Sequence, residues 1–168
     1  MERLNELVMQ HKFVPSRVRT NLATGPEDLT HYKSSKFLRH AILSNAVREG
    51  PMLALVREML PDAGITELCL NKCDPARPMA AHRDGKNSSD LSYIALFGYF
   101  TGGALCLEDG RRFEKPGTWF DFDGRNLTHW VEPFEGERYS VVAYARKHPA
   151  RVPKRPVPAA TQSRPCDL

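Results

Sequence analysis

The sequence predicts an α+β protein in which N-terminal helices cover a double-stranded β-helix, or jelly roll. The chain has 168 residues, a length that suits a single domain with a substantial hydrophobic core. Residues 26–60 repeat apolar side chains at the three-to-four spacing of helices. From Ile65 onward, short runs rich in β-branched and aromatic residues alternate with turn signals, a pattern typical of an all-β sandwich or barrel.

The helical region is expected to form two helices separated by Gly50-Pro51. Pro26 lies near the start of the first, followed by acidic residues in its first turn. The segment from Pro61 to Gly64 ends the second helix. Both helices are expected to cover one side of the β structure.

Six strands are expected in the second half of the chain, at 65–71, 91–100, 103–107, 117–122, 127–132 and 137–146. Turns are expected at Asp109-Gly110, Pro116-Gly117 and Asp123-Gly124. Several short antiparallel strands behind covering helices favour a jelly roll packed on its helical side.

Charge and proline content divide the chain at residue 146. Residues 1–146 are expected to form one domain, and 147–168, which hold five of the thirteen prolines, a basic disordered tail. Five basic residues against one acidic residue give this tail the whole formal net charge of +4. The domain itself is formally neutral, so attraction to a polyanion must come from local clusters or from the tail.

The cysteines and the N-terminus favour an intracellular protein, cytoplasmic or nuclear. Cys69, Cys73, Cys106 and Cys166 match neither a disulfide scaffold nor a Cys-x-x-Cys metal site. No signal-peptide pattern and no run of about 18 apolar residues is present, so we expect no membrane partner. The glycosylation-type triplets at Asn87 and Asn126 are therefore expected to be accidental.

His82, Asp84 and His129 form the most informative constellation. Residues i and i+2 of an extended segment project to one side, so His82 and Asp84 can present an imidazole nitrogen and a carboxylate oxygen to one point. His129, on another expected strand, completes the set. Two histidines and one carboxylate form the facial triad of non-haem Fe(II) oxygenases, which leaves coordination positions open.

Arg138 and Ser140 predict a carboxylate clamp near this triad. Arg138 follows His129 by nine residues on the last expected strand, and Ser140 shares its face. A guanidinium can bond both oxygens of a carboxylate at once. A metal triad combined with a carboxylate clamp suits a keto-acid that chelates the metal and has a distal carboxylate, namely 2-oxoglutarate.

These residues resemble the Fe(II)- and 2-oxoglutarate-dependent dioxygenases, whose pattern is His-x-Asp, a distal His and an Arg about ten residues later. The resemblance covers about residues 65–146. Residues 97–105, 122–124 and 129–144 look like stretches of the TET/JBP and prolyl-hydroxylase-like branches. Asn71 is similar to the Asn of the Asn-x-Tyr motif in AlkB-type enzymes, whose amide helps hold 2-oxoglutarate, and Cys73 stands where the Tyr would be.

The resemblance implies Fe(II) as cofactor, 2-oxoglutarate and O2 as cosubstrates, and hydroxylation of a substrate C–H bond. The favoured substrate is a 5-methylpyrimidine in nucleic acid, which must be flipped out and stacked. The residues available for stacking or phosphate contact are Tyr93, Tyr99, Phe100, Trp130, Phe134, Arg83, Lys86 and Asn87. The alternatives are a protein (prolyl-type) hydroxylase and a catalytically silent jelly-roll binding module. The complete ligand set argues against the silent module.

The remaining histidines, cysteines and aromatic residues are expected to be structural. His11, His31, His40 and His148 are expected on the surface or in helix packing. Cys69 and Cys73 are expected to be buried strand thiols, and Trp119, Phe120 and Phe122 to lie in the core. Trp130 can belong to the core or to the pocket wall.

Overall fold

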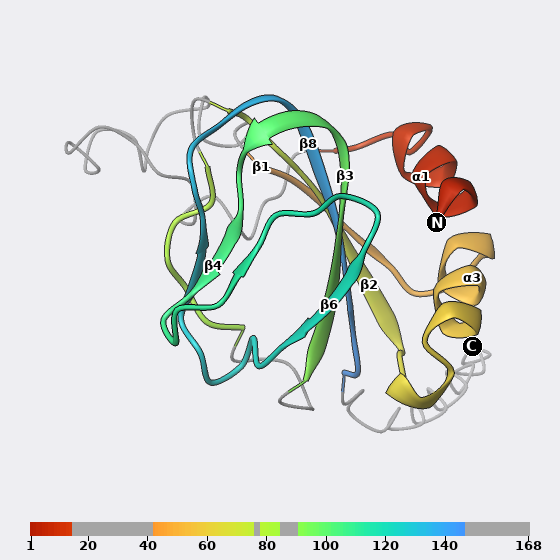
Figure 1. The fold of residues 1–168 in the computed structure, drawn as a ribbon. Helices are drawn as coiled ribbons and strands as arrows, with labels where there is room; N and C mark the ends of the chain where they lie inside the picture. Colours follow the sequence, from red (N-terminus) through yellow and green to blue (C-terminus); the bar gives the residue numbers. More distant parts are fainter. Residues whose placement is uncertain (15–41, 76–77, 85–90, 147–168) are drawn as a thin grey trace, which may run out of the picture.

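The computed structural model describes residues 1–14, 42–75, 78–84 and 91–146 (Figure 1). The helical elements are α1 (Glu2–Met9), α3 (Pro51–Met59) and a short 3-10 helix, η2 (Pro61–Ala63). The strands are β1 (Ile42–Val47), β2 (Glu67–Cys73), β3 (Ser92–Gly102), β4 (Leu105–Leu107), β5 (Arg112–Phe113), β6 (Trp119–Phe122), β7 (His129–Val131) and β8 (Phe134–Tyr144). No helix in these ranges is both long enough and apolar enough to span a membrane.

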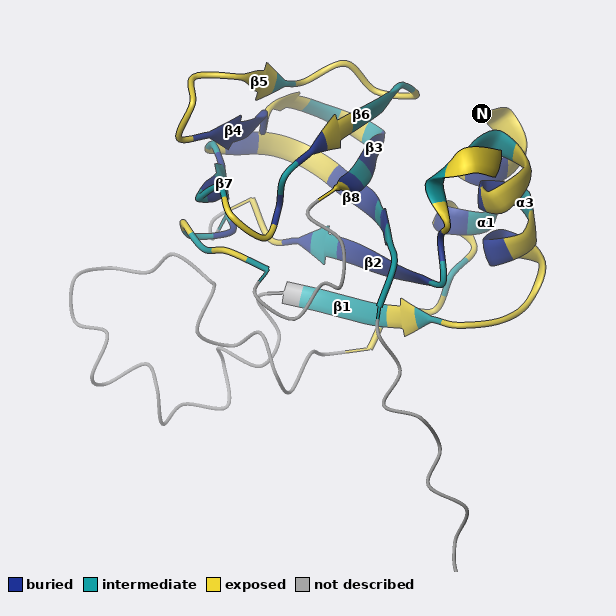
Figure 2. Cartoon of the chain, turned by 90° about the horizontal axis from the view of Figure 1, so that it is seen from below, coloured by how far each residue is buried: buried dark blue, intermediate teal, exposed yellow. Residues whose placement is uncertain are grey.

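The strands form two antiparallel sheets, as expected for a jelly roll. The larger sheet has the order β1-β2-β8-β3-β6, and the smaller has the order β5-β4-β7. Helices α1 and α3 lie beside the larger sheet, on the side away from β4 and β7 (Figures 1 and 2). The predicted fold class, α+β with a jelly roll and covering helices, is confirmed.

Alternation along β8 divides the interior into two cores. Tyr139, Val141 and Ala143 pack against α1 and α3 in the first core. Arg138 and Ser140 lie on the opposite face of the strand, toward the smaller sheet. The second core fills the space between the sheets with residues such as Leu96 and Phe122. One strand therefore supplies both a helix-packing face and a polar inner face.

The first predicted helix is wrong where the structure describes it. Residues 42–47 form strand β1, which pairs antiparallel with β2 from Ile42↔Cys73 to Val47↔Leu68. Ile, Val, Ser and Asn have modest helix propensity, and pairing with β2 outweighs the helical spacing of the apolar residues. Residues 26–41, the rest of that prediction, lie outside the described residues.

The second predicted helix is confirmed as α3, which ends at Met59, just before Pro61. The six predicted strands match β2, β3, β4, β6, β7 and β8, although β8 begins at Phe134, three residues earlier than expected. Helix α1 and the two-residue strand β5 were not predicted. The division into a domain of 1–146 and a tail of 147–168 stays a prediction, since the tail lies outside the described residues.

Candidate metal and cosubstrate site

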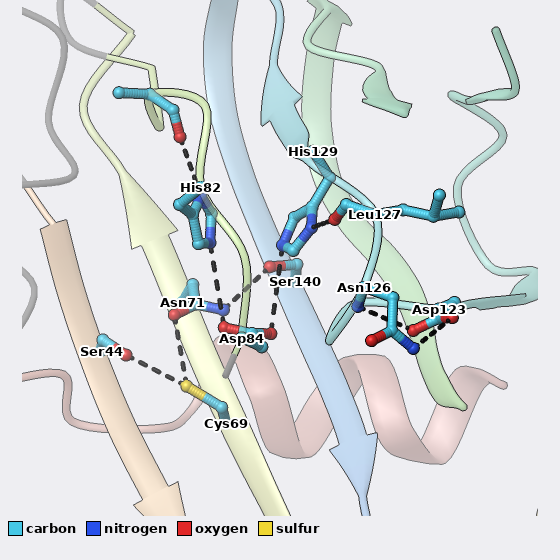
Figure 3. A network of polar contacts seen from close by, with 11 residues as sticks. Ser44, Cys69, Asn71, His82, Asp84, Asp123, Asn126, Leu127, His129 and Ser140 are labelled. Carbon is cyan, nitrogen blue, oxygen red and sulfur yellow. Dashed lines mark hydrogen bonds and ion pairs between the residues drawn. The ribbon is translucent and has the colours of Figure 1, made fainter. Parts of the chain in front are cut away.

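His82, Asp84 and His129 converge on one point, as their spacing predicts (Figure 3). One ligand atom from each residue lies within 4.8 Å of the others. The imidazole of His129 is buried on β7, and its ring centroid is 4.3 Å from that of His82. These three groups can hold one divalent metal ion.

Backbone hydrogen bonds fix the triad. The amide N–H groups of His82 and His129 each donate to the carbonyl oxygen of the other residue at 3.0 Å. The amide N–H of Asp84 donates to the Gly124 carbonyl oxygen at 2.7 Å. The segment that carries His82 and Asp84 is therefore tied to β7 and to the loop before it, and ligands 47 residues apart are held by a few short bonds.

The ring nitrogens of both histidines are oriented for metal binding. Nδ1 of His82 lies 2.8 Å from the Ala80 carbonyl oxygen, and Nδ1 of His129 lies 3.0 Å from that of Leu127. A carbonyl oxygen only accepts, so each Nδ1 donates its hydrogen and each Nε2 keeps a lone pair. The two Nε2 atoms lie 3.9 and 4.0 Å from the Asp84 carboxylate oxygens, which leaves space between the ligands. This donor set fits Fe(II).

The loop between β6 and β7 supports Asp84 through Gly124. Asp123 caps this loop by accepting hydrogen bonds from the backbone and side-chain nitrogens of Asn126, at 2.9 and 2.8 Å (Figure 3). Partial desolvation acts to raise the pKa of Asp123, but the hydrogen bonds from Asn126 and Arg125 outweigh it and lower the pKa. The capped loop holds the Gly124 carbonyl in place for the Asp84 amide.

Arg138 is a buried cation that makes no ion pair among the described residues. Its side chain is 1% exposed, and its Nε donates to the Gly103 carbonyl oxygen at 2.7 Å. Its guanidinium carbon lies 5.8 Å from the centre of the Phe100 ring, and its Nη2 is buried with no hydrogen-bond partner in the described part of the chain. Burial lowers the pKa of Arg138. A carboxylate ligand would supply the missing partner.

Gly103 gives the Arg138 side chain its space. Its φ is +66°, and a Cβ there would lie 2.9 Å from Arg138 Cδ and 2.9 Å from Phe134 Cβ. Gly103 lies within residues 97–105, which resemble the oxygenase family, but its role was not predicted from the sequence. The pair of consecutive glycines at 102 and 103 was the available signal for that role. The hydrogen bond between Asp84 and Gly124 was not predicted either, and its only signal in the sequence is the expected turn at Asp123-Gly124.

One cavity brings all six predicted site residues together. It is lined by the metal triad together with Asn71, Arg138 and Ser140, and its remaining walls are apolar: Met79, Ile94, Leu105, Phe122, Val131 and Val142. Asn71 Nδ2 donates to Ser140 Oγ at 3.3 Å. Cys73 is buried directly opposite Arg138 in the β2–β8 pairing.

The aromatic residues considered for base stacking do not line this cavity in the described structure. Tyr93 packs beside the helix-side core, while Phe134 and Phe100 belong to the core between the sheets. Tyr99 is 86% exposed, and Trp130 is half-buried on β7. Trp130 is therefore not part of this cavity's wall.

Arg83 is already bound by neighbouring polar groups. Its Nη2 donates to both Glu108 carboxylate oxygens at 3.1 and 3.2 Å, and its Nε donates to Thr128 Oγ1 at 3.0 Å. Hydrogen bonds from Thr128, followed by those from Arg83, lower the pKa of Glu108. Lys86 and Asn87 lie outside the described residues.

The remaining cysteines, aromatic residues and histidines were expected to be structural, and their burial matches that expectation only in part. Cys69 and Cys73 are buried thiols on β2 that form no disulfide, as expected. Phe122 is buried, whereas Trp119 and Phe120 are only half-buried. His11 packs edge-on against Phe13 and lies 3.2 Å from Asn45 Oδ1. His31, His40, His148 and Cys166 lie outside the described residues.

Solved structures share this fold at low sequence identity. A 2OG-Fe(II) oxygenase family oxidoreductase from Burkholderia pseudomallei is 19% identical, covers 65% of this chain and 70% of its own, and gives a TM-score of 0.50. A Pseudomonas putida prolyl-4-hydroxylase is 16% identical, covers 88% of this chain and 83% of its own, and gives a TM-score of 0.56. NgTET1 in complex with 5mC DNA is 22% identical over 57% of this chain and 43% of its own, with a TM-score of 0.43.

No protein-family model matches the sequence, and no match was found among curated proteins. The similarity to these solved structures is a similarity of fold. The predicted resemblance is confirmed at that level: the chain has the jelly-roll fold of the 2OG-Fe(II) oxygenases, and within it His82, Asp84 and His129 meet at one point.

Proposed function

We propose that the protein is an Fe(II)- and 2-oxoglutarate-dependent dioxygenase that hydroxylates a C–H bond of its substrate. The observation that carries this proposal is the Arg138 guanidinium, buried with an unpartnered Nη2 beside the same cavity as the His82–Asp84–His129 cluster. A metal site alone is compatible with many reactions. A buried cation next to it calls for an anionic cosubstrate.

Each residue has a distinct task in this proposal. His82, Asp84 and His129 would hold Fe(II), with the histidine rings oriented by the Ala80 and Leu127 carbonyls. Arg138 and Ser140 would bind the distal carboxylate of 2-oxoglutarate, and Asn71 supports Ser140. The apolar walls exclude water from the reacting groups. When bound, iron, 2-oxoglutarate and O2 supply the oxidising chemistry, which releases succinate and CO2.

Succinate formation tests this proposal. Anaerobically purified protein supplied with Fe(II), 2-oxoglutarate and then O2 should form succinate slowly, even without a second substrate. His82→Ala should abolish this turnover and weaken Mn(II) binding measured by calorimetry. His11→Ala, a histidine away from the cavity, is the matched control and should leave both unchanged. Absence of turnover in the wild type together with normal folding would support the silent binding module instead.

A 5-methylpyrimidine in nucleic acid is the first candidate substrate, as the sequence predicts. This candidate needs phosphate contacts from residues other than Arg83, because Glu108 and Thr128 already bind that side chain. Two further arginines of the smaller sheet and its turn are also bound by carboxylates: Arg111 by Asp109, and Arg112 by Glu132. Lys86, Asn87 and the tail, which the sequence also offers for such contacts, lie outside the described residues.

Protein hydroxylation is the second candidate, and the ion pair of Arg83 with Glu108, beside the metal ligands, favours it. A neutral peptide does not need free cations around the cavity, whereas a polyanion does. Incubation with methylated DNA, methylated RNA and proline-rich peptides, followed by mass spectrometry for the gain of one oxygen atom, separates the candidates. Oxidation of the peptides alone would overturn the nucleic-acid candidate.

A further inference from the structure

A chain of four polar side chains runs from strand β1 to the cavity (Figure 3). Ser44 Oγ lies 3.1 Å from Cys69 Sγ, and Cys69 Sγ lies 3.4 Å from Asn71 Oδ1. Asn71 Nδ2 then lies 3.3 Å from Ser140 Oγ. Ser140 borders the cavity beside Arg138. The chain links a half-buried residue of β1, at one edge of the larger sheet, to the proposed cosubstrate site.

The strand register explains why these four side chains meet. Ser44 lies directly opposite Asn71 in the β1–β2 pairing, and Asn71 lies directly opposite Ser140 in the β2–β8 pairing. Directly opposite residues of antiparallel strands share a face of the sheet. Cys69 precedes Asn71 by two residues and therefore points to the same side. Cys69, Asn71 and Ser140 are all less than one-tenth exposed. Buried polar side chains usually have hydrogen-bond partners, and these three find theirs in one another.

Every member of this chain can reverse its hydrogen bond. A hydroxyl and a thiol each donate and accept, and a side-chain amide can exchange its oxygen and nitrogen by a flip. In one direction, Ser44 donates to Cys69, Cys69 to Asn71 Oδ1, and Asn71 Nδ2 to Ser140. The Ser140 hydroxyl hydrogen is then available to the cavity. In the reverse direction, Ser140 donates to Asn71 and presents only lone pairs to the cavity.

An anion in the cavity selects the first direction, because a carboxylate oxygen attracts a donor and repels lone pairs. Hydrogen bonds aligned in one direction also polarise and strengthen one another. We propose that Cys69, assisted by Ser44, is a positioning residue that orients Asn71 so that Ser140 donates to the distal carboxylate of the cosubstrate. This inference rests on the proposed function and extends it to residues that do not line the cavity.

Binding of 2-oxoglutarate to the Mn(II)-loaded protein, measured by calorimetry, tests the role of the thiol. Cys69→Ala removes the donor to Asn71 and should weaken binding roughly three- to tenfold, the effect of one modest hydrogen bond. Cys69→Ser keeps a donor and an acceptor and should restore most of the affinity. Cys106 is a buried thiol on β4 that takes no part in the Ser44–Cys69–Asn71–Ser140 hydrogen bonds. Cys106→Ala is therefore the matched control and should bind 2-oxoglutarate as the wild type does. A purely structural role would predict equal losses in Cys69→Ser and Cys69→Ala.

The S–H stretching band in the infrared spectrum gives a second readout, measured on the wild-type protein. The Cys69 band is assigned by its absence in Cys69→Ala or, if that variant does not fold, in Cys69→Ser. In the wild-type protein this band should shift when 2-oxoglutarate binds. The shift reports the stronger donation to Asn71 expected of the aligned chain. Ser44→Ala should reduce this shift and weaken binding by a smaller factor.

The two proposals fail in different ways. If the wild-type protein binds no 2-oxoglutarate and forms no succinate, the proposed function is wrong, and the orienting role of Cys69 falls with it. If the wild type binds and turns over 2-oxoglutarate while Cys69→Ala binds equally well, only the role of Cys69 is wrong. An unchanged S–H band on binding would also refute that role, with the oxygenase assignment left intact.

Discussion

Arg138 donates from Nε to the Gly103 carbonyl oxygen at 2.7 Å, while its Nη2 is buried without a partner among the described residues. Burial of a charged group without an opposite charge costs free energy, on the order of several kcal/mol. The lowered pKa of Arg138 expresses the same cost. The protein thus holds a destabilising group where an anionic ligand would need it.

Arg138→Met should therefore stabilise the ligand-free protein and remove cosubstrate binding. Methionine keeps much of the side-chain volume and removes the buried charge, although it leaves the Gly103 carbonyl without its donor. We expect a net gain of about 1–3 kcal/mol in the free energy of unfolding, measured by urea denaturation. Calorimetry should show at least a tenfold loss of 2-oxoglutarate affinity, with Mn(II) binding retained. A destabilised variant that still binds 2-oxoglutarate would contradict both expectations.

Gly103→Ala should disturb Arg138 through steric contact. The new Cβ would lie 2.9 Å from both Arg138 Cδ and Phe134 Cβ, and φ is +66°. Gly110→Ala is the matched control, because its φ is +89° with nothing within 4 Å of the new Cβ. The control should lose about 1–2 kcal/mol from backbone strain alone. Gly103→Ala should lose roughly 1–3 kcal/mol more and raise the KM for 2-oxoglutarate; equal losses would mean that the contact with Arg138 is unimportant.

Asp123→Asn should make the protein less stable at neutral pH, and the difference should vanish in acid. The pKa of Asp123 is lowered in the folded protein, so its ionised form stabilises the fold above the ordinary aspartate pKa of about 3.9. That contribution is lost as the pH falls through the lowered pKa. We expect a deficit of about 1 kcal/mol at pH near 7. Urea denaturation at several pH values checks this, and a deficit that persists in strong acid would exclude ionisation as the cause.

Deletion of residues 147–168 should weaken binding to any polyanion. This segment carries formal charge +4, which is the net charge of the whole chain. Binding of a DNA oligonucleotide, measured across salt concentrations, should show a slope reduced by about 0.9 for each phosphate that the tail no longer neutralises. Succinate formation without a second substrate should not change, since no proposed site residue is removed. A variant that keeps residues 147–168 but has their lysines and arginines changed to glutamine should behave like the deletion.

Spacing along the chain predicted much of the candidate site. His82 and Asp84 share a side because extended backbone has a period of two, and Arg138 and Ser140 share a face of β8 for the same reason. Such relations depend only on local backbone geometry. The second helix, six strands and the jelly-roll class followed from similarly local signals.

The helical spacing of apolar residues gave a wrong prediction where strand pairing between distant segments decides the structure. Residues 42–47 fit a helical pattern, yet they pair with β2 across more than twenty residues of sequence. That pairing places Ser44 opposite Asn71, a relation that no local pattern in the sequence predicts. Likewise, the sequence offered Arg83 for contact with phosphate, whereas in the folded protein its guanidinium donates hydrogen bonds to Glu108.

By itself, the sequence determined which residue types can bind a metal and a carboxylate, and which of them share a strand face, because side-chain chemistry and backbone period are local properties. Only the tertiary structure decided what surrounds those groups. The Gly103 carbonyl at Arg138, the Gly124 carbonyl at Asp84 and the Ser44–Cys69–Asn71–Ser140 chain each join segments distant in sequence. Burial and hydrogen-bond partners arise only when strands pack, since a linear pattern does not specify which groups are removed from water.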